Sequence, residues 1–346
     1  MKVRILTVAL ISVGCVLLII FLFLLSYEVN RAPNNFIRLF PPHVVLPDTE
    51  IKIQYNAGYI AGADKKNIYL GENLAFNFIL SVDKANSKTQ LIKIDIQPAA
   101  KMRTGEAKVF IDSPYFFLTG AMLKSAYRGS ISEWIARPYF KNKVVTDVAI
   151  PIKDSSFIFR IIDRTKGYSL AKSNNGSTAM QKAPDLLEKQ VDDFFSKDGM
   201  LHYNKKAGQL VYLYYYRNQF TVADTNLKLV YKGKTIDTVS QAKIKIGSPD
   251  KNGEIKLAEP PVVVNKKSCV SDEYLFVQSN LKADNEDIEQ FKNAWVVDVY
   301  EIENGKYKLS FYLPKTKTGK IKDMKVTGKT MAVLYEHKLC TYKLNF

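Results

Sequence analysis

The sequence predicts an all-β fold, a six-bladed β-propeller behind one N-terminal transmembrane helix. Three observations support this. The chain starts with a long uncharged apolar segment, short strand-like segments recur from about Ile51 to the C-terminus, and these segments fall into six groups. Propellers contain four to eight blades of four-stranded sheet, and roughly 50 residues per group fits known blade repeats. A pair of β-sandwiches is the alternative.

The N-terminal segment from Ile5 to Tyr27 contains no charged residue. A helix of roughly 20 apolar residues is enough to cross about 30 Å of hydrocarbon. A secretory signal would have a shorter apolar core followed by a small-residue cleavage site, and no A-x-A pattern follows here. We therefore predict a retained signal-anchor over residues 5–27 with the lipid bilayer as its partner, and a cytoplasmic end over residues 1–4.

A lipoprotein signal that ends at Gly14-Cys15 is the rival interpretation, and it requires Cys15 to become the mature N-terminus. The residues from Val16 to Leu25 stay apolar, whereas a lipoprotein turns polar after its cysteine. Lys2 and Arg4 favour the cytoplasmic side for the N-terminus. Residues 28–346 are then expected outside the membrane.

The external part divides into residues 28–48, a linker and possible closing strand, and residues 49–346, the propeller domain. The last group of strands, within residues 322–344, has only three members. A propeller closes when an N-terminal strand completes its last blade, and this removes an exposed sheet edge. Residues 36–45 or 47–55 are the candidates for that strand.

Helical patterns are scarce after the anchor. Ala183 to Phe195 places several apolar residues near one helical face, and Asp284 to Phe291 could form another helical turn. We expect both to be insertions between strands.

Several strand-like segments resemble those of the uncharacterised membrane-anchored six-bladed propeller proteins of Gram-negative bacteria, in the broad TolB-like group. The landmarks are Tyr59-Ile60-Ala61-Gly62, Ile68-Tyr69-Leu70-Gly71, Tyr214 to Phe220 with Asp224, Tyr274-Leu275-Phe276-Val277, Val297-Asp298-Val299-Tyr300 and Ser310-Phe311-Tyr312-Leu313-Pro314. The resemblance implies the propeller fold, a single-pass inner-membrane protein and a periplasmic C-terminal domain. It implies no activity.

The net charge of +16 comes mainly from lysines scattered between the strands. Such a charge indicates nucleic-acid binding only when it is concentrated on one face, so we expect no nucleic-acid partner. A basic external domain could instead attract anionic headgroups or an acidic polymer. The densest cluster of lysines is the candidate basic patch: Lys315, Lys317, Lys320, Lys322, Lys325 and Lys329.

The chain carries no recognised catalytic motif. It has only three histidines, His43, His202 and His337, and it lacks a G-x-S-x-G turn, an H-E-x-x-H motif and a P-loop. The sequence favours a protein that is not an enzyme, and we expect no cofactor and no metal. The acidic run 284–287 lacks the glycine and spaced glutamate of an EF-hand. Whether Cys269 and Cys340 are bridged is left open by the sequence.

The most unusual local chemistry is a tyrosine-rich strand followed by a polar triplet. Tyr216, Arg217, Asn218 and Gln219 are the candidate binding residues, although core packing of the neighbouring tyrosines is the competing interpretation. The predicted function is a membrane-anchored periplasmic propeller that binds or scaffolds an envelope protein or polymer. The alternative is a propeller-type enzyme whose site is assembled at the central channel.

Overall fold

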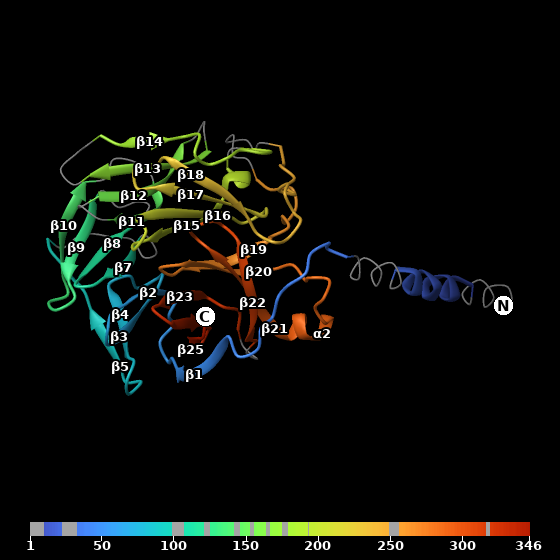
Figure 1. Cartoon of the computed structure of the whole chain (residues 1–346), viewed down its shortest axis with the longest axis horizontal. Helices are drawn as coiled ribbons and strands as arrows, with labels where there is room; N and C mark the ends of the chain where they lie inside the picture. The colour runs from blue at the N-terminus through green and yellow to red at the C-terminus, as the bar shows by residue number, and fades with distance from the viewer. Residues whose placement is uncertain are drawn as a thin grey trace, which may run out of the picture.

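The chain is a mostly-β six-bladed propeller, described by a computed structural model (Figure 1). The described residues are 10–22, 33–98, 107–120, 125–141, 146–152, 156–163, 167–174, 179–192, 194–248, 256–315 and 319–346. They form six sheets around a central axis, which confirms the predicted propeller and excludes the pair of β-sandwiches.

The first three sheets follow one another along the chain. Blade 1 contains β2 (Tyr59–Ala63), β3 (Asn67–Gly71), β4 (Phe78–Asp83) and β5 (Thr89–Lys93). Blade 2 contains β7 (Lys108–Asp112), β8 (Tyr115–Thr119), β9 (Ser125–Ser130), β10 (Ile135–Lys141) and the short parallel strand β6 (Asp95–Ile96). Blade 3 contains β11 (Thr146–Ile152), β12 (Ser156–Asp163), β13 (Gly167–Asn174) and β14 (Gln181–Ala183).

The other three sheets complete the ring. Blade 4 contains β15 (Gly199–Asn204), β16 (Gln209–Tyr214), β17 (Gln219–Asp224) and β18 (Leu229–Lys234). Blade 5 contains β19 (Asn265–Val270), β20 (Tyr274–Ser279), β21 (Ala294–Glu301) and β22 (Tyr307–Pro314). Blade 6 contains β23 (Asp323–Thr327), β24 (Thr330–Leu334), β25 (Lys338–Leu344) and β1 (Val45–Lys52).

The core lies between neighbouring blades. Val211 and Phe220 of blade 4, for example, pack in one cluster with Leu275 and Tyr300 of blade 5. Both faces of each sheet are therefore buried, and the middle strands are nearly continuous apolar runs rather than alternating ones. This packing fixes the inner edge of every blade around the central axis.

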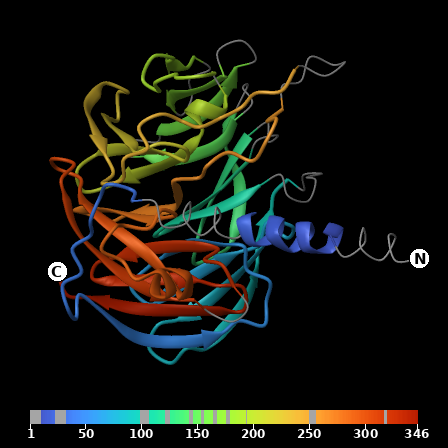
Figure 2. The same cartoon turned by 90° about the vertical axis from the view of Figure 1, so that its right-hand side faces the viewer.

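The last blade is closed by the N-terminal strand. β1 pairs antiparallel with β25, from Val45 opposite Leu344 to Lys52 opposite Lys338. Both views show blue β1 beside the red C-terminal strands (Figures 1 and 2). β1 overlaps both segments that the sequence suggested for closure. It removes the exposed edge of β25 and ties the two ends of the ring together.

Residues 33–40 form an N-terminal latch on blade 5. The backbone N–H groups of Asn34 and Asn35 donate to the two oxygens of Asp284, at 2.7 and 2.9 Å. Phe40 stacks on Tyr312 with ring centroids 4.6 Å apart. The N–H of Ser310 donates to the carbonyl of Leu39. Within the predicted linker, this stretch is thus fixed to the propeller.

Arg38 holds the latch in place and is only 3% exposed. Its guanidinium makes a bidentate contact with Asp298, at 2.7 and 3.1 Å, and an ion pair with Glu286. The two carboxylates are held in turn by hydroxyl donors, Ser310 to Asp298 and Tyr312 to Glu286. Burial alone would lower the pKa of Arg38, but these carboxylates outweigh it and raise the pKa.

The predicted insertions differ from the structure in detail. In the described part of residues 183–195 no α-helix forms, because β14 ends at Ala183, Pro184 follows, and only a 3₁₀ turn (Phe195–Lys197) appears. The carboxylate of Asp192 caps that turn by accepting the N–H of Phe195. The second helix is α2 (Ile288–Asn293), shifted towards the C-terminus, with Asp287 as its N-cap.

Residues 10–22 form a helix whose side chains are all exposed. In Figure 1 it projects away from the propeller. The ends of the predicted anchor, residues 5–9 and 23–27, lie outside the described residues. Among those that are described, no helix combines the length and apolarity of a membrane span.

Candidate functional site

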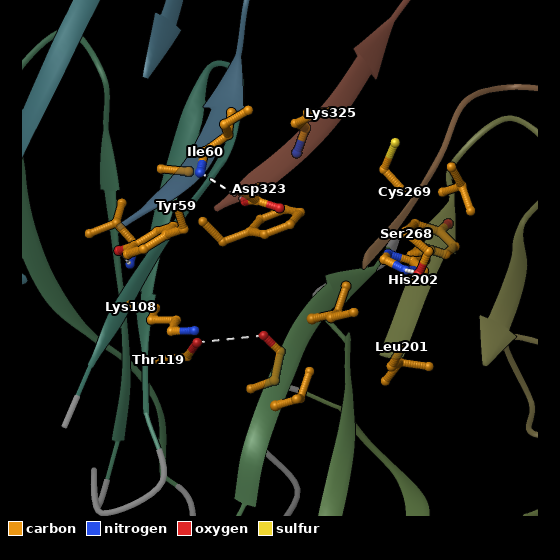
Figure 3. A pocket seen from close by; sticks show the side chains of 18 of the residues that line it. Tyr59, Ile60, Lys108, Thr119, Leu201, His202, Ser268, Cys269, Asp323 and Lys325 are labelled. Atoms are coloured by element: carbon orange, nitrogen blue, oxygen red, sulfur yellow. Dashed lines mark hydrogen bonds between the residues drawn. The ribbon is translucent and has the colours of Figure 1, made fainter. Parts of the chain in front are cut away.

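The main cavity is the central channel of the propeller, with a volume of about 490 Å³. The innermost strand of each of the six blades contributes to its wall. Much of this wall is apolar, with Ile60, Val148, Ile150, Leu201 and Val270 among the lining residues. Polar side chains gather against these apolar walls, mainly from blades 4, 5 and 6 (Figure 3). Such a cavity has the size and character of a small-molecule site.

Asp323 begins β23 and joins blade 6 to blade 1. One carboxylate oxygen accepts the backbone N–H of Ile60 at 2.9 Å, and the other accepts the N–H of Met324 at 2.9 Å. Burial raises the pKa of this carboxyl. Asp323 is thus fixed by backbone donors, and it supplies an acceptor in the channel wall.

Lys325 lies two residues further along β23, and strand alternation places it on the same side as Asp323. Its Nζ is 5.1 Å from the centroid of the Phe110 ring. Within the described part of the chain it has no hydrogen-bond acceptor and no ion pair. Burial lowers the pKa of Lys325, while the charge of Asp323 opposes this effect. The channel therefore holds an ammonium group that no described residue pairs by a hydrogen bond or an ion pair.

His202 on β15 and Ser268 on β19 make a hydrogen bond across the interface of blades 4 and 5. The His202 Nε2 and Ser268 Oγ atoms are 2.7 Å apart. Burial, together with the charge of Lys325, lowers the pKa of His202 to about 4. The imidazole is therefore neutral at pH 7. Cys269, beside Ser268, is buried, and burial raises the pKa of its thiol.

Lys108 on β7 supplies a second cation in the wall of the channel (Figure 3). Its Nζ lies 5.4 Å from the centroid of the Tyr59 ring, and the Tyr59 hydroxyl accepts the N–H of Val109. Lys108, Lys325 and Asp323 all line the channel, which gives its wall two cations and one carboxylate. This balance of charge favours a ligand with an anionic group.

The predicted binding residues lie at the end of β16 and the start of β17, away from the channel wall. Arg217 is fully buried, and its guanidinium donates to the carbonyls of Ser196 and Glu188, at 2.7 and 2.8 Å. Asn218 is also buried, Gln219 accepts from Arg217, and Tyr216 is half-buried. Binding by this group stays a prediction. In this structure the Arg217 guanidinium contacts the protein's own groups rather than solvent.

The lysines of the predicted basic patch point to different places. Lys325 lies in the channel, Lys322 donates to Asn56 and Ala57, and Lys315 donates to the carbonyl of Phe291. Lys320 and Lys329 are exposed. Lys317 lies outside the described residues. One member of the set, Lys325, thus belongs to the candidate site.

The acidic run that invited a calcium interpretation holds the latch instead. Asp284 binds the N–H groups of the latch, Asn285 bonds with the backbone of Arg38, and Glu286 pairs with its side chain. Among the described residues no three His, Cys, Asp or Glu side chains gather as metal ligands. Cys269 and Cys340 are free thiols.

The channel residues Lys108, His202, Ser268 and Asp323 are not among the site residues predicted from the sequence. These residues come from four blades and are far apart in sequence, so no local motif marks them. The one available signal is the spacing of Asp323 and Lys325, two ionisable residues at i and i+2 on an inner strand.

Comparison with known proteins supports the fold. No protein family and no curated protein matches the chain. A catalytically inactive variant of virginiamycin B lyase from Staphylococcus aureus, solved with quinupristin, is similar with a TM-score of 0.51 and 12% identity, over 86% of this chain and 99% of that one.

Two further solved structures are similar. A member of the DUF4221 family from Bacteroides vulgatus has a TM-score of 0.52 and 14% identity, over 87% of this chain and 97% of that one. A putative exported protein from Bacteroides fragilis has a TM-score of 0.50 and 8% identity, over 90% and 98%. The chain is thus a six-bladed β-propeller that resembles bacterial propellers.

Proposed function

We propose that this protein is a membrane-anchored ligand-binding propeller, held at the periplasmic face of the inner membrane by residues 5–27. Its central channel takes a small component of the envelope that combines an apolar body with an anionic group such as a carboxylate. The propeller acts as a binding module, and the ligand enters the channel rather than resting on a blade.

The observation that carries this proposal is the unpaired ammonium of Lys325 inside the channel. Lys325 is half-buried in the channel wall, and holding a charge partly out of water without a partner is costly. Elsewhere in the propeller a buried cation such as Arg38 has carboxylate partners. A bound anion would supply the missing partner, and Lys108 would add to the attraction. The apolar side chains of Ile150, Leu201 and Val270 would cover the body of the ligand.

A direct test compares an anion with its neutral analogue. Benzoate and benzamide have the same ring, and only benzoate carries a charge, so we expect benzoate alone to bind the full-length protein in detergent by isothermal titration. Lys325→Met should weaken benzoate binding at least about tenfold, because a charge-assisted contact contributes roughly 1.5–3 kcal/mol. Lys329→Met removes an exposed lysine nearby and is the matched control. Equal binding of benzamide, or unchanged benzoate binding by Lys325→Met, would reject the proposal.

The proposed membrane anchor and periplasmic location do not depend on the channel residues. The sequence is uncharged from residue 5 to residue 27, and its described part, residues 10–22, is helical and exposed. N-terminal sequencing of the membrane-extracted protein tests the retained anchor. A mature chain that starts at Cys15 with attached lipid, or after residue 27, would contradict it.

Catalysis in the same channel is a second candidate function, favoured by the hydrogen bond between His202 and Ser268. A neutral imidazole within 2.7 Å of a hydroxyl can act as its general base. Among the described residues, however, no group orients Nδ1 of His202, as the acid of a triad would. Hydrolysis of p-nitrophenyl acetate by the wild type that is lost in Ser268→Ala would favour this candidate over binding alone.

A further inference from the structure

A second group of cations lies on blade 2, in the outer half of the sheet and apart from the channel. Arg128 on β9 and Arg137 on β10 occupy directly opposed positions in the antiparallel pair. Side chains at such positions share a face of the sheet, with Cβ atoms about 4.5–5.5 Å apart. Two like charges at this spacing destabilise a sheet unless something compensates them.

Among the described residues, no acidic side chain compensates these two charges. Over the ranges that the structure describes, neither guanidinium group has an ion pair or a hydrogen bond. The Arg128 guanidinium lies against two aromatic rings, 3.6 Å from the centroid of Tyr115 and 5.0 Å from that of Tyr139. These contacts fix its plane and leave its N–H donors without acceptors.

The two arginines border a hollow of about 210 Å³. Its wall includes Tyr115, Ser130 and Tyr139 as well as both arginines. Arg137 is exposed and Arg128 is half-buried, so the hollow is open to solvent. Tyrosine rings at its rim offer a flat surface for a sugar or another ring, and the Ser130 hydroxyl is 2.7 Å from the hydroxyl of Ser132.

We propose that this hollow, the blade-2 site, binds the phosphate group of a phosphate monoester. A phosphate monoester carries a charge of about −1.5 to −2 at pH 7 and three acceptor oxygens. Two guanidinium groups match that charge, and their rigid forks bind phosphate oxygens in pairs. The organic part of the ester would lie against Tyr115. The site is separate from the channel. Its five named residues come from β8, β9 and β10, and none of them lines the channel.

Isothermal titration of the full-length protein in detergent with inorganic phosphate and with glucose 6-phosphate tests this proposal. We expect saturable binding of both ligands, tighter for glucose 6-phosphate because of its ring. Arg137→Gln, a change at an exposed residue, should weaken both at least about tenfold, since charge-assisted hydrogen bonds are lost. Lys93→Gln removes one positive charge from an exposed position on blade 1 and should leave binding unchanged.

Arg128→Lys is a more specific test, because it keeps the positive charge but removes the planar guanidinium group that can bind two phosphate oxygens. We expect it to bind phosphate at least severalfold more weakly than the wild type. Short-chain phosphatidic acid distinguishes the source of the phosphate: if it binds as tightly as glucose 6-phosphate, the ligand is a lipid headgroup, and if it does not, a soluble ester. Absence of binding in the wild type, or wild-type affinity in Arg137→Gln, would overturn the proposal.

Discussion

The N-terminal latch and the central channel both hold a cation partly or fully out of water, and they treat it in opposite ways. In the latch, Arg38 meets Asp298 and Glu286, and each carboxylate has a further hydroxyl donor. In the channel, the Lys325 ammonium lies near the Phe110 ring, and among the described residues it makes no ion pair or hydrogen bond, although the charge of Asp323 acts on it. A buried charge with all its partners stabilises the fold, whereas a half-buried charge without such a partner indicates a place for a ligand. Arg38 is therefore a structural cation, and Lys325 is the cation that we propose for ligand binding.

The largest effect is expected from breaking the latch. Arg38→Met leaves two buried carboxylates without their cation, and loss of one partner of a buried ion pair costs about 3–5 kcal/mol. Chemical unfolding of the full-length protein should report a loss of this size. Lys338→Met breaks an exposed pair with Glu50 and should cost less than about 1 kcal/mol. A similar small loss in both variants would mean that the latch does not stabilise the propeller.

A smaller loss is expected at Arg217, whose partners are neutral. Arg217→Met leaves the carbonyls of Ser196 and Glu188 without a donor, which costs roughly 1–3 kcal/mol. Thermal melting of the variant checks this value. Should the variant keep the wild-type melting temperature and lose a partner in a pull-down from detergent extract, the binding role predicted from the sequence would be correct instead.

The dependence of stability on pH tests the burial of His202. Its pKa is about 4 in the folded protein and about 6.5 in the unfolded chain. Between pH 6.5 and 4 the unfolded chain therefore binds more protons, and stability falls as the pH falls through this window. From pH 7 to pH 5 the wild type should lose about 1 kcal/mol more than His202→Gln, allowing for partial solvent access to the channel. An equal loss in both proteins would show that His202 is accessible to protons.

Much of the fold could be predicted from the sequence because each blade repeats the same physical pattern. Apolar runs such as Leu210 to Tyr214 are separated by short polar turns, and the incomplete last group pointed to closure from the N-terminus. β13 (Gly167–Asn174) contains few large apolar residues, so the sequence alone does not mark it as a strand. The helix predicted over residues 183–195 was wrong because Leu186 and Leu187 pack into the core from an irregular segment.

The site could not be predicted in the same way, because it depends on contacts between blades. Asp323 meets the backbone of Ile60, which is 263 residues away in the chain. His202 and Ser268 likewise meet only once blades 4 and 5 pack together. Arg217 illustrates the converse problem, since a polar triplet after an aromatic strand suggests a surface until neighbouring loops cover it.

The most direct test of the account compares the unfolding free energies of Arg38→Met and Lys325→Met, measured side by side on full-length protein without ligand. Arg38→Met should lose about 3–5 kcal/mol. Lys325→Met replaces an unpaired ammonium by an apolar side chain of similar length, so its stability should stay within about 0.5 kcal/mol of the wild type or increase. A loss at Lys325→Met as large as that at Arg38→Met would contradict the account, because Lys325 would then be a structural residue and the channel would have no free cation for a ligand.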